Sequence, residues 1–365
     1  MAQRYKNEII EEVPEVDAVL GTTSYGDILK AIREAMEGKH FQEFKDIDYL
    51  PEKLGKRVLT TGGHFGYLKI AEGCDKHCTY CIIPKLRGKF RSVPMERLVT
   101  QAKEMAEEGV KELILVAQET TVYGTDIYGK KSLHILLKEL CKIKGIRWIR
   151  VLYCYPEEIY DELIQTMKEE KKICHYLDLP IQHASDRILK RMGRRTTQAE
   201  LVEIVNKLRR EIPDIVLRTT LISGFPGETQ EDHEELMSFV DEMEFDRLGV
   251  FTYSPEEDTP AATMPDQVAE EVKEARRDEI MELQQEISYD KGTDRIGQEL
   301  LVMIEGKVAD ESAYIGRTYG DAPKVDGYIF VQTGELLMTG DFAKVRVTGA
   351  LEYDLIGELA DEYTE

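Results

Sequence analysis

Three cysteines, Cys74, Cys78 and Cys81, are the residues whose type and spacing most clearly indicate chemistry in this sequence. They stand on one short segment, directly after an apolar run at residues 67–70 that we expect to form a strand. Thiolates are the usual protein ligands of iron–sulfur clusters, and a cubic [4Fe-4S] cluster normally takes four of them. Three thiolates on one loop therefore predict a cluster whose fourth iron has no protein ligand and is open to another molecule, as metals in catalytic sites are.

Two other interpretations of the same cysteines are weaker. His77 could be the fourth ligand of a zinc site, but it lies between Cys74 and Cys78, where joint ligation is awkward. A disulfide is disfavoured because three close cysteines leave one unpaired and the N-terminus lacks the apolar segment of a signal peptide. We favour the cluster, and keep a zinc- or cluster-containing binding module without catalysis as an alternative.

Composition limits the partners of this chain. Its 365 residues are 42% hydrophobic and 32% charged, which is typical of a folded protein, and its apolar runs are too short to cross a membrane. Six cysteines in such a chain indicate a reducing cytoplasm. The net charge of −22 disfavours nucleic acid as the main substrate, because phosphate binding needs a basic surface.

The cysteine segment opens a region of alternating strands and helices at residues 60–265. Residues 1–59 precede it, with a helical pattern at 27–37 and an irregular, linker-like stretch at 39–56. Alternation of this kind predicts an α/β fold, a partial (βα)6 barrel similar to a TIM barrel, with functional loops at the carboxyl ends of its strands. The expected strands are 67–70, 113–117, 148–153, 176–179, 216–222 and 247–251, and the expected helices lie near 95–108, 133–141, 157–169, 198–211 and 231–243.

The last hundred residues change character. Residues 266–291 form one amphipathic helical pattern, which we expect Gly292 to end. Residues 292–362 contain short β-rich runs at 300–305, 314–317, 327–331 and 342–350, separated by Gly and Asp. This pattern predicts a small five-stranded β-barrel that resembles an oligonucleotide-binding fold.

Several motifs together resemble the methylthiotransferase branch of the radical S-adenosylmethionine (SAM) superfamily. They lie at residues 67–74, the cysteine loop, 82–88, 115–120, 180–185, 192–195 and 218–228, and the terminal β segment is similar to a TRAM domain. Within the branch, the loop at 84–92 is similar to enzymes that modify a small-subunit ribosomal protein. Residues 292–360 also carry six Lys/Arg against twelve Asp/Glu, which suits a basic protein better than RNA.

The resemblance implies a radical reaction. SAM would bind the open iron and be cleaved reductively to a 5′-deoxyadenosyl radical, with electrons from a reduced flavodoxin- or ferredoxin-like donor. The radical would abstract hydrogen from the β-carbon of an aspartate in a small-subunit ribosomal protein, and a methylthio group would then be added there. The alternative within the branch is methylthiolation of an adenosine in transfer RNA.

The resemblance also implies roles for individual residues beside the three catalytic, cluster-binding cysteines. Tyr80 would lie near the SAM adenine, or alternatively serve only in packing, and Gln118 would lie near the methionine part of SAM. We expect Arg218 to pair with the SAM carboxylate, the alternative being a surface salt bridge, because an arginine within an apolar strand needs a buried partner. Gly224 would form a tight turn that lets the backbone approach SAM.

Members of this branch carry a second [4Fe-4S] cluster on three further cysteines of an N-terminal domain. The start of this sequence resembles the stretch just after those cysteines, so residues 1–59 are expected to be the remnant of that domain and its linker. We interpret Cys141, Cys154 and Cys174 as structural thiols, because each lies in or next to an apolar run. The chain as given is therefore expected to cleave SAM without completing methylthiolation.

Overall fold

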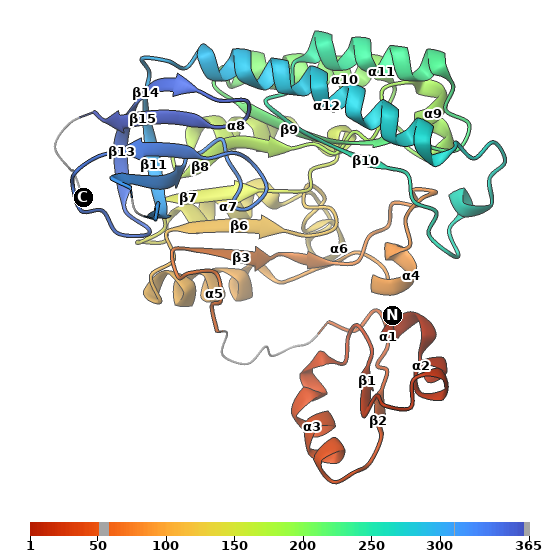
Figure 1. Ribbon diagram of the computed structural model, residues 1–365. Helices are drawn as coiled ribbons and strands as arrows, with labels where there is room; N and C mark the ends of the chain where they lie inside the picture. Colours follow the sequence, from red (N-terminus) through yellow and green to blue (C-terminus); the bar gives the residue numbers. More distant parts are fainter. Residues whose placement is uncertain (51–57, 310, 361–365) are drawn as a thin grey trace.

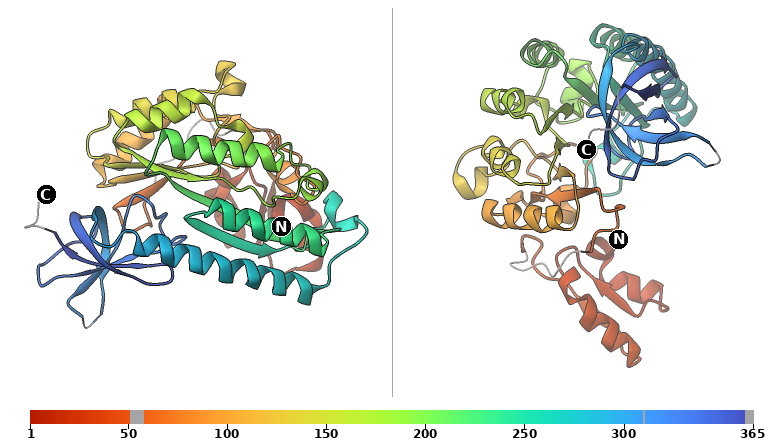
Figure 2. Two further views of the ribbon diagram at one scale, coloured as in Figure 1. Left: turned by 90° about the horizontal axis from the view of Figure 1, so that it is seen from above. Right: turned by 90° about the vertical axis from the view of Figure 1, so that its left-hand side faces the viewer.

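A computed structural model describes residues 1–50, 58–309 and 311–360 of the chain. At its centre lies a sheet of six parallel strands in the order β10-β9-β8-β7-β6-β3, which curves into a partial barrel with β3 and β10 at its two edges (Figure 1 and Figure 2). This is the predicted α/β architecture. The strands are β3 (Phe65–Lys69), β6 (Glu112–Val116), β7 (Trp148–Val151), β8 (Ile173–Asp178), β9 (Val216–Ser223) and β10 (Arg247–Thr252).

Helices between these strands cover the outer face of the sheet (Figure 1). The strands read as nearly continuous apolar runs because both faces are covered; Leu113 and Ile114, on opposite faces of β6, are both fully buried. The five predicted helices are α5 (Met95–Glu107), α7 (Leu133–Cys141), α8 (Asp161–Glu169), α10 (Gln198–Glu211) and α11 (Gln230–Met243). Short helices that we did not predict are α4 (Ile83–Arg87), α6 (Thr125–Tyr128) and α9 (Asp186–Arg191).

Three boundaries of two predicted helices were wrong. The helix expected from residue 157 begins at Asp161, because Pro156–Glu158 forms a 3-10 turn and Ile159 and Tyr160 are extended. The long helix α12 (Glu270–Thr293) begins later than expected and does not end at Gly292. Gly292 instead allows a close approach: a Cβ there would lie 3.1 Å from the Cβ of Ala350. In the described part of the chain, no helix is long and apolar enough to span a membrane.

The N-terminal residues form a small unit of their own beside the barrel (Figure 1). The helix predicted at 27–37 is confirmed as α3, but the stretch expected to be irregular contains a strand, β2, which pairs in parallel with β1. Residues 51–56 of that predicted linker lie outside the described residues. The elements are α1 (Ala2–Tyr5), α2 (Asn7–Glu12), β1 (Ala18–Leu20), α3 (Ile28–Met36) and β2 (Phe41–Glu43).

The C-terminal residues form the predicted five-stranded barrel, closed in the order β11-β12-β13-β15-β14. It packs against the amino ends of the sheet strands: Phe65 and Trp148, the first residues of β3 and β7, share a buried cluster with Met303 and Phe342. The ring of Trp148 meets that of Phe342 edge-on, with centroids 4.8 Å apart. The strands are β11 (Glu299–Lys307), β12 (Ala313–Arg317), β13 (Ile329–Gln332), β14 (Phe342–Ala350) and β15 (Leu355–Leu359).

A buried ionic network joins the two barrels. The Glu112 carboxylate, on β6, accepts hydrogen bonds from Arg150 Nε at 2.8 Å and from Arg317 Nη2, on β12, at 2.7 Å. All three side chains are at most 1% exposed, so each buried charge is stabilised by its oppositely charged partners rather than by water. The C-terminal barrel is thus fixed at the amino ends of the strands, and the opposite, carboxyl ends face the cysteine loop.

Candidate functional site

The cysteine loop follows β3 at the carboxyl end of the sheet, on the face where we predicted it. Cys74 and Cys78 are buried, and Cys81 is half-buried. Gly73 leads into the loop with φ +76°, and a Cβ there would lie 2.1 Å from the backbone oxygen of Lys89. The N–H of Cys74 donates to the Gly88 oxygen at 3.2 Å. A glycine is therefore required at position 73, where the loop runs against the segment that follows it.

The end of α9 braces the other side of the loop. Thr79 donates from its N–H to the Met192 oxygen at 2.9 Å and from Oγ1 to the Arg191 oxygen at 2.8 Å. A Cβ on Gly193 would lie 3.0 Å from the His77 oxygen, so the two backbones are in close contact. The loop that carries the thiols is consequently held from both sides.

The chemistry of the three thiols fits an iron–sulfur cluster. Burial raises the pKa of Cys74 to about 11 and also raises the pKa of Cys81, so both are protonated at neutral pH unless a cation is bound. The N–H of Lys76 points at Cys74 Sγ at 3.4 Å, and the Tyr155 hydroxyl lies 3.6 Å from Cys78 Sγ. Across residues 1–50, 58–309 and 311–360, no three His, Cys, Asp or Glu side chains already have a metal-binding arrangement.

Buried polar atoms without a hydrogen-bond partner gather near this loop. They belong to residues that follow β6, β7 and α9: Gln118 Oε1, Glu119 Oε2, Glu157 Oε2, and both Nε and Nη1 of Arg194. A buried polar atom that lacks a hydrogen bond costs about 1–3 kcal/mol, so folded proteins rarely leave several together. A polar ligand bound beside the loop could supply the hydrogen bonds that these buried atoms lack.

Glu119 was missed by the sequence analysis although it adjoins the predicted Gln118. Its side chain is 1% exposed, and burial raises its pKa to about 7. One oxygen accepts hydrogen bonds from the N–H of Thr121 at 2.9 Å and from the Thr121 hydroxyl. Its charge raises the pKa of Cys74, which indicates that the carboxyl lies near the thiols. Nothing in the sequence distinguishes it from a surface glutamate.

Tyr80 and Gly224 lie near each other, because the Tyr80 ring contacts Phe225, the residue after Gly224. The Tyr80 ring is 6.4 Å from that of Phe225, edge-on, and the Phe225 ring is 5.3 Å from that of Tyr253. Gly224 has φ +70°, and a Cβ there would lie 2.2 Å from Lys273 Cγ. The tight turn expected at Gly224 is therefore present, and the SAM contacts of Tyr80 and Gly224 stay predictions.

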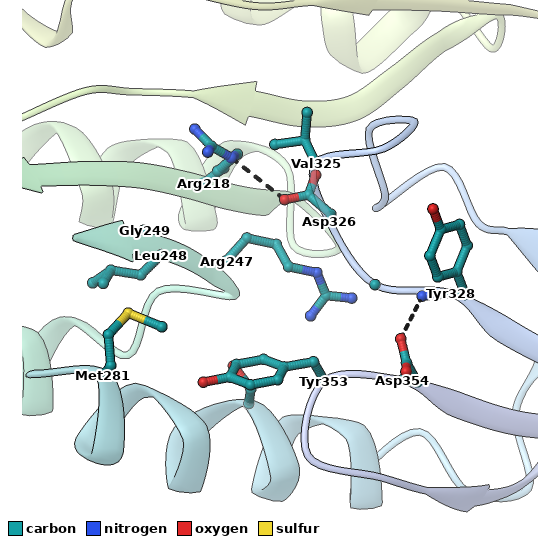
Figure 3. Close-up of a pocket in the computed structure, with 12 residues that line it drawn as sticks. Arg218, Arg247, Leu248, Gly249, Met281, Val325, Asp326, Tyr328, Tyr353 and Asp354 are labelled. Carbon is teal, nitrogen blue, oxygen red and sulfur yellow. Dashed lines mark hydrogen bonds and ion pairs between the residues drawn. The ribbon is translucent and has the colours of Figure 1, made fainter. Parts of the chain in front are cut away.

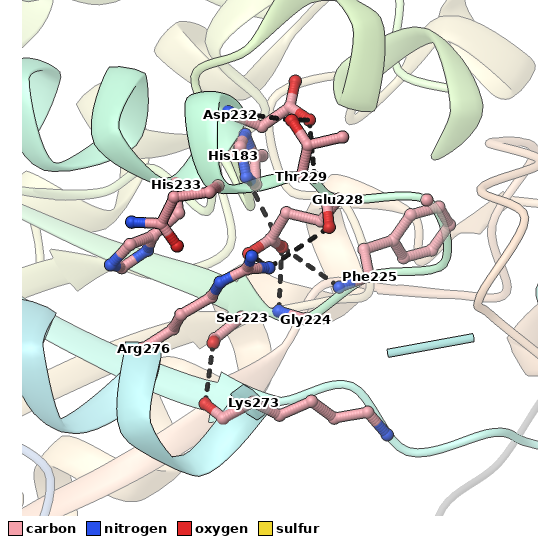
Figure 4. Close-up of polar contacts among 12 residues, drawn as sticks. His183, Ser223, Gly224, Phe225, Glu228, Thr229, Asp232, His233, Lys273 and Arg276 are labelled. Atoms are coloured by element: carbon pink, nitrogen blue, oxygen red, sulfur yellow. Dashed lines mark hydrogen bonds and ion pairs between the residues drawn. The ribbon is translucent and has the colours of Figure 1, made fainter. Parts of the chain in front are cut away.

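A buried carboxylate holds this turn, as Figure 4 shows. Glu228 Oε2 accepts from the N–H groups of Gly224 at 2.8 Å and Phe225 at 3.1 Å. Arg276 Nη1 donates to its other oxygen at 2.9 Å, and His183 Nε2 lies 3.6 Å from Oε2. Glu228 and Arg276 were also missed, because they come together only through the docking of α12.

Arg218 lies apart from these residues. Its Nη1 donates to Asp178 at 2.8 Å, and its Nε lies 3.4 Å from Asp326 of the C-terminal barrel. With Arg247 and Tyr353 it lines a cavity of about 350 Å³ between the amino ends of β9 and β10, α12 and the C-terminal barrel (Figure 3). The structure thus places Arg218 in salt bridges with two buried carboxylates rather than in the surface salt bridge that was the alternative, and pairing with the SAM carboxylate stays a prediction.

The remaining three cysteines lie on different elements and do not share one loop. Cys154 is fully buried and lies 3.3 Å from the Thr120 hydroxyl, and Cys174 is 2% exposed on β8. Cys141 is half-buried at the end of α7. The interpretation as structural thiols is consistent with these positions.

Comparisons with known proteins match both parts of the chain. Residues 68–240 match the model of the radical SAM superfamily, and residues 296–360 match that of the TRAM domain. The chain is 64% identical to the ribosomal protein uS12 methylthiotransferase RimO of Lachnoclostridium phytofermentans, over 98% of this chain and 81% of that protein. It is 53% identical to the protein of the same name from Clostridium perfringens, over 99% of this chain and 81% of that protein.

Among solved structures, coproporphyrinogen III oxidase (HemN) of Escherichia coli matches with a TM-score of 0.47 and 17% identity. The match covers 78% of this chain and 66% of that one.

Proposed function

Because the chain belongs to the RimO family of radical SAM methylthiotransferases, we propose that it adds a methylthio group to the β-carbon of an aspartate in ribosomal protein uS12. The reaction then takes place in the cytoplasm, where ribosomes are. A reduced flavodoxin- or ferredoxin-like protein is the proposed electron donor. The proposed sulfur donor is the second [4Fe-4S] cluster that the family implies; residues 1–59 contain no cysteine to bind it, so the proposal places its ligands outside the given sequence.

The three cysteines are the proposed ligands of a [4Fe-4S] cluster with one open iron. When bound, the cluster and SAM supply the radical that removes hydrogen from an unactivated C–H bond, which side-chain acids and bases cannot do. The protein contributes a braced loop, two buried thiols and one half-buried thiol, and the N–H of Lys76, which points at Cys74 Sγ. The binding residues are Cys74, Cys78 and Cys81.

The single observation that carries the proposal is the gathering of unpartnered polar atoms near these thiols. SAM has an amino group, a carboxylate and a ribose, and each needs a polar partner when it leaves water. Gln118 Oε1 and Glu119 Oε2 are acceptors suited to N–H or O–H groups, and Arg194 offers donors. Tyr80 and Gly224 would form the wall along which the adenine lies.

The C-terminal barrel supports a protein substrate rather than RNA. Arg317, one of its six basic residues, is buried against Glu112 and cannot bind phosphate. Arg346 is paired with Glu299 at 2.9 Å. The basic surface of this barrel is therefore even smaller than its composition indicates.

Deuterium transfer tests the proposal. Reconstituted enzyme would be reduced anaerobically with SAM and uS12 whose aspartates carry deuterium at the β-carbon, and the released 5′-deoxyadenosine analysed by mass spectrometry. We expect deuterium in the 5′-deoxyadenosine, and none when uS12 is unlabelled. Absence of deuterium, together with methylthiolation of transfer RNA under the same conditions, would overturn the proposal.

A further inference from the structure

Tyr153 is an exposed aromatic residue whose backbone has a conformation that tyrosine rarely adopts. It comes just after the carboxyl end of β7, its φ is +60°, and it is 49% exposed. Its neighbours in the sequence, Leu152 and Cys154, are both buried. A left-handed backbone brings the Cβ of a tyrosine close to a carbonyl oxygen, and residues strained in this way gather at functional sites.

Contacts from two other segments hold the Tyr153 backbone in place. Its N–H donates to Asp178 Oδ2 at 3.1 Å, and its oxygen accepts from the N–H and from the hydroxyl of Thr120, both at 3.0 Å. The surrounding fold therefore imposes the left-handed conformation. Because the ring is half exposed, it adds little to the core, so folding alone gives no reason for a tyrosine at this position.

The exposed ring lies at the opening of the barrel. β7 is an interior strand of the sheet; helices cover its outer face, and the C-terminal barrel covers its amino end (Figure 1). A side chain can therefore reach water here only from inside the open barrel. Burial and then Glu112 raise the pKa of Tyr67, and Tyr153 adds to this shift although Tyr67 lies on β3, two strands away. This effect across the sheet agrees with an inward position for Tyr153.

The opening is the side of the cysteine loop. Tyr155, two residues further on, places its hydroxyl 3.6 Å from Cys78 Sγ. Thr120, which holds the Tyr153 oxygen, directly follows Glu119, one of the residues with an unpartnered buried oxygen near the thiols. In the proposed reaction the β-carbon of the substrate aspartate must come to this opening, where it would meet the ring of Tyr153.

We propose that Tyr153 is a specificity-determining residue whose ring packs against the aspartate-bearing segment of uS12. This inference rests on the proposed function. A tyrosine ring supplies a large contact area with few rotatable bonds, and its face also attracts the basic side chains of a ribosomal protein. The strained backbone is retained, in this account, because it turns the ring toward the protein substrate instead of the core.

The test compares Y153G, Y153A and Y153F with wild type and two matched controls. Glu244 is also exposed and left-handed, with φ +42° at the end of α11, so E244G relieves the same kind of strain elsewhere. Tyr289, on α12, is 49% exposed like Tyr153, so Y289A removes an equally exposed ring. Each protein is reconstituted, its iron counted, and its urea unfolding measured. The Kd for labelled uS12 is then measured by fluorescence anisotropy with SAM present and without reductant.

We expect the Kd for uS12 to rise at least about tenfold in Y153G and Y153A, which remove the ring, and to stay within about threefold of wild type in Y153F, which keeps it. The two controls should bind uS12 as wild type does. The urea midpoint of Y153G should be at or above that of wild type, as for E244G, because glycine adopts the left-handed conformation without strain.

An unchanged Kd for uS12 in folded, cluster-loaded Y153G and Y153A would overturn the inference. A lower urea midpoint for Y153G than for wild type would also overturn it, since Tyr153 would then be a structural residue. In either case, transfer of deuterium from labelled uS12 to 5′-deoxyadenosine by wild type would leave the proposed function intact. Wild type that transfers no deuterium would instead refute the proposed function.

Discussion

Replacing Glu119 by glutamine should change how the stability of the metal-free protein depends on pH. Burial raises the pKa of this carboxyl from an ordinary value of 4.5 to about 7. Below pH 4.5 the carboxyl is protonated in both the folded and unfolded states, and it costs nothing. Between pH 4.5 and 7 it ionises only when the protein unfolds, so the free energy of unfolding falls as pH rises, and above pH 7 the full loss is present.

The size of the loss follows from the two pKa values. At about 1.4 kcal/mol per pKa unit, the difference corresponds to about 3 kcal/mol. Glu119→Gln removes the titration, so the variant should gain about 3 kcal/mol over wild type at pH 8 and nothing at pH 4.

Urea unfolding of both proteins from pH 4 to 8 measures this difference. Glu107→Gln, on the exposed face of α5, is the control for the change of net charge. A difference between Glu119→Gln and wild type that is the same at pH 4 and pH 8 would refute the reasoning, since it would mean that Glu119 is not a buried titrating group.

Two further substitutions test the contacts that shape the molecule. Glu112→Gln should lower the free energy of unfolding by about 3–5 kcal/mol, because it leaves the buried guanidiniums of Arg150 and Arg317 without their shared carboxylate. A loss below about 1 kcal/mol in urea unfolding would contradict the importance of this ionic network. Gly224→Ala should cost about 1–3 kcal/mol and weaken SAM binding, because a methyl group at φ +70° would overlap Lys273. Equilibrium dialysis with labelled SAM measures the second effect, and unchanged affinity would place the turn outside the site.

The helices and strands that could be predicted from the sequence are those with apolar residues along the whole length of one face. The six strands and five helices of the sheet were found because each presents a continuous apolar run or stripe to its neighbours. Short helices such as α9 were missed because six residues give too little of the helical period. Gly292 was wrongly expected to end a helix. A glycine at this position instead leaves room for Ala350, a contact that no local sequence pattern reveals.

The site was predictable to a similar extent. The cysteine spacing located the loop, and Gln118 was placed correctly at the end of a strand. Glu119 and Arg194 were not identified, because what marks each of them is a buried polar atom that lacks a hydrogen-bond partner. This burial depends on loops that meet only in the folded chain. Arg218 was expected to face SAM because an arginine in an apolar strand needs a buried partner. The structure shows two such partners within the protein, Asp178 and Asp326, which no local pattern indicates.

The release of 5′-deoxyadenosine by cysteine variants tests the central claim most directly. Wild type, C74A, C78A and C81A are reconstituted anaerobically, their iron counted, and each is incubated with SAM and dithionite; C141A, which changes a half-buried cysteine outside the loop, is the control. We expect about four irons at the loop and steady 5′-deoxyadenosine release for wild type and C141A, and loss of both in each loop variant. Undiminished 5′-deoxyadenosine release by any loop variant would contradict the account.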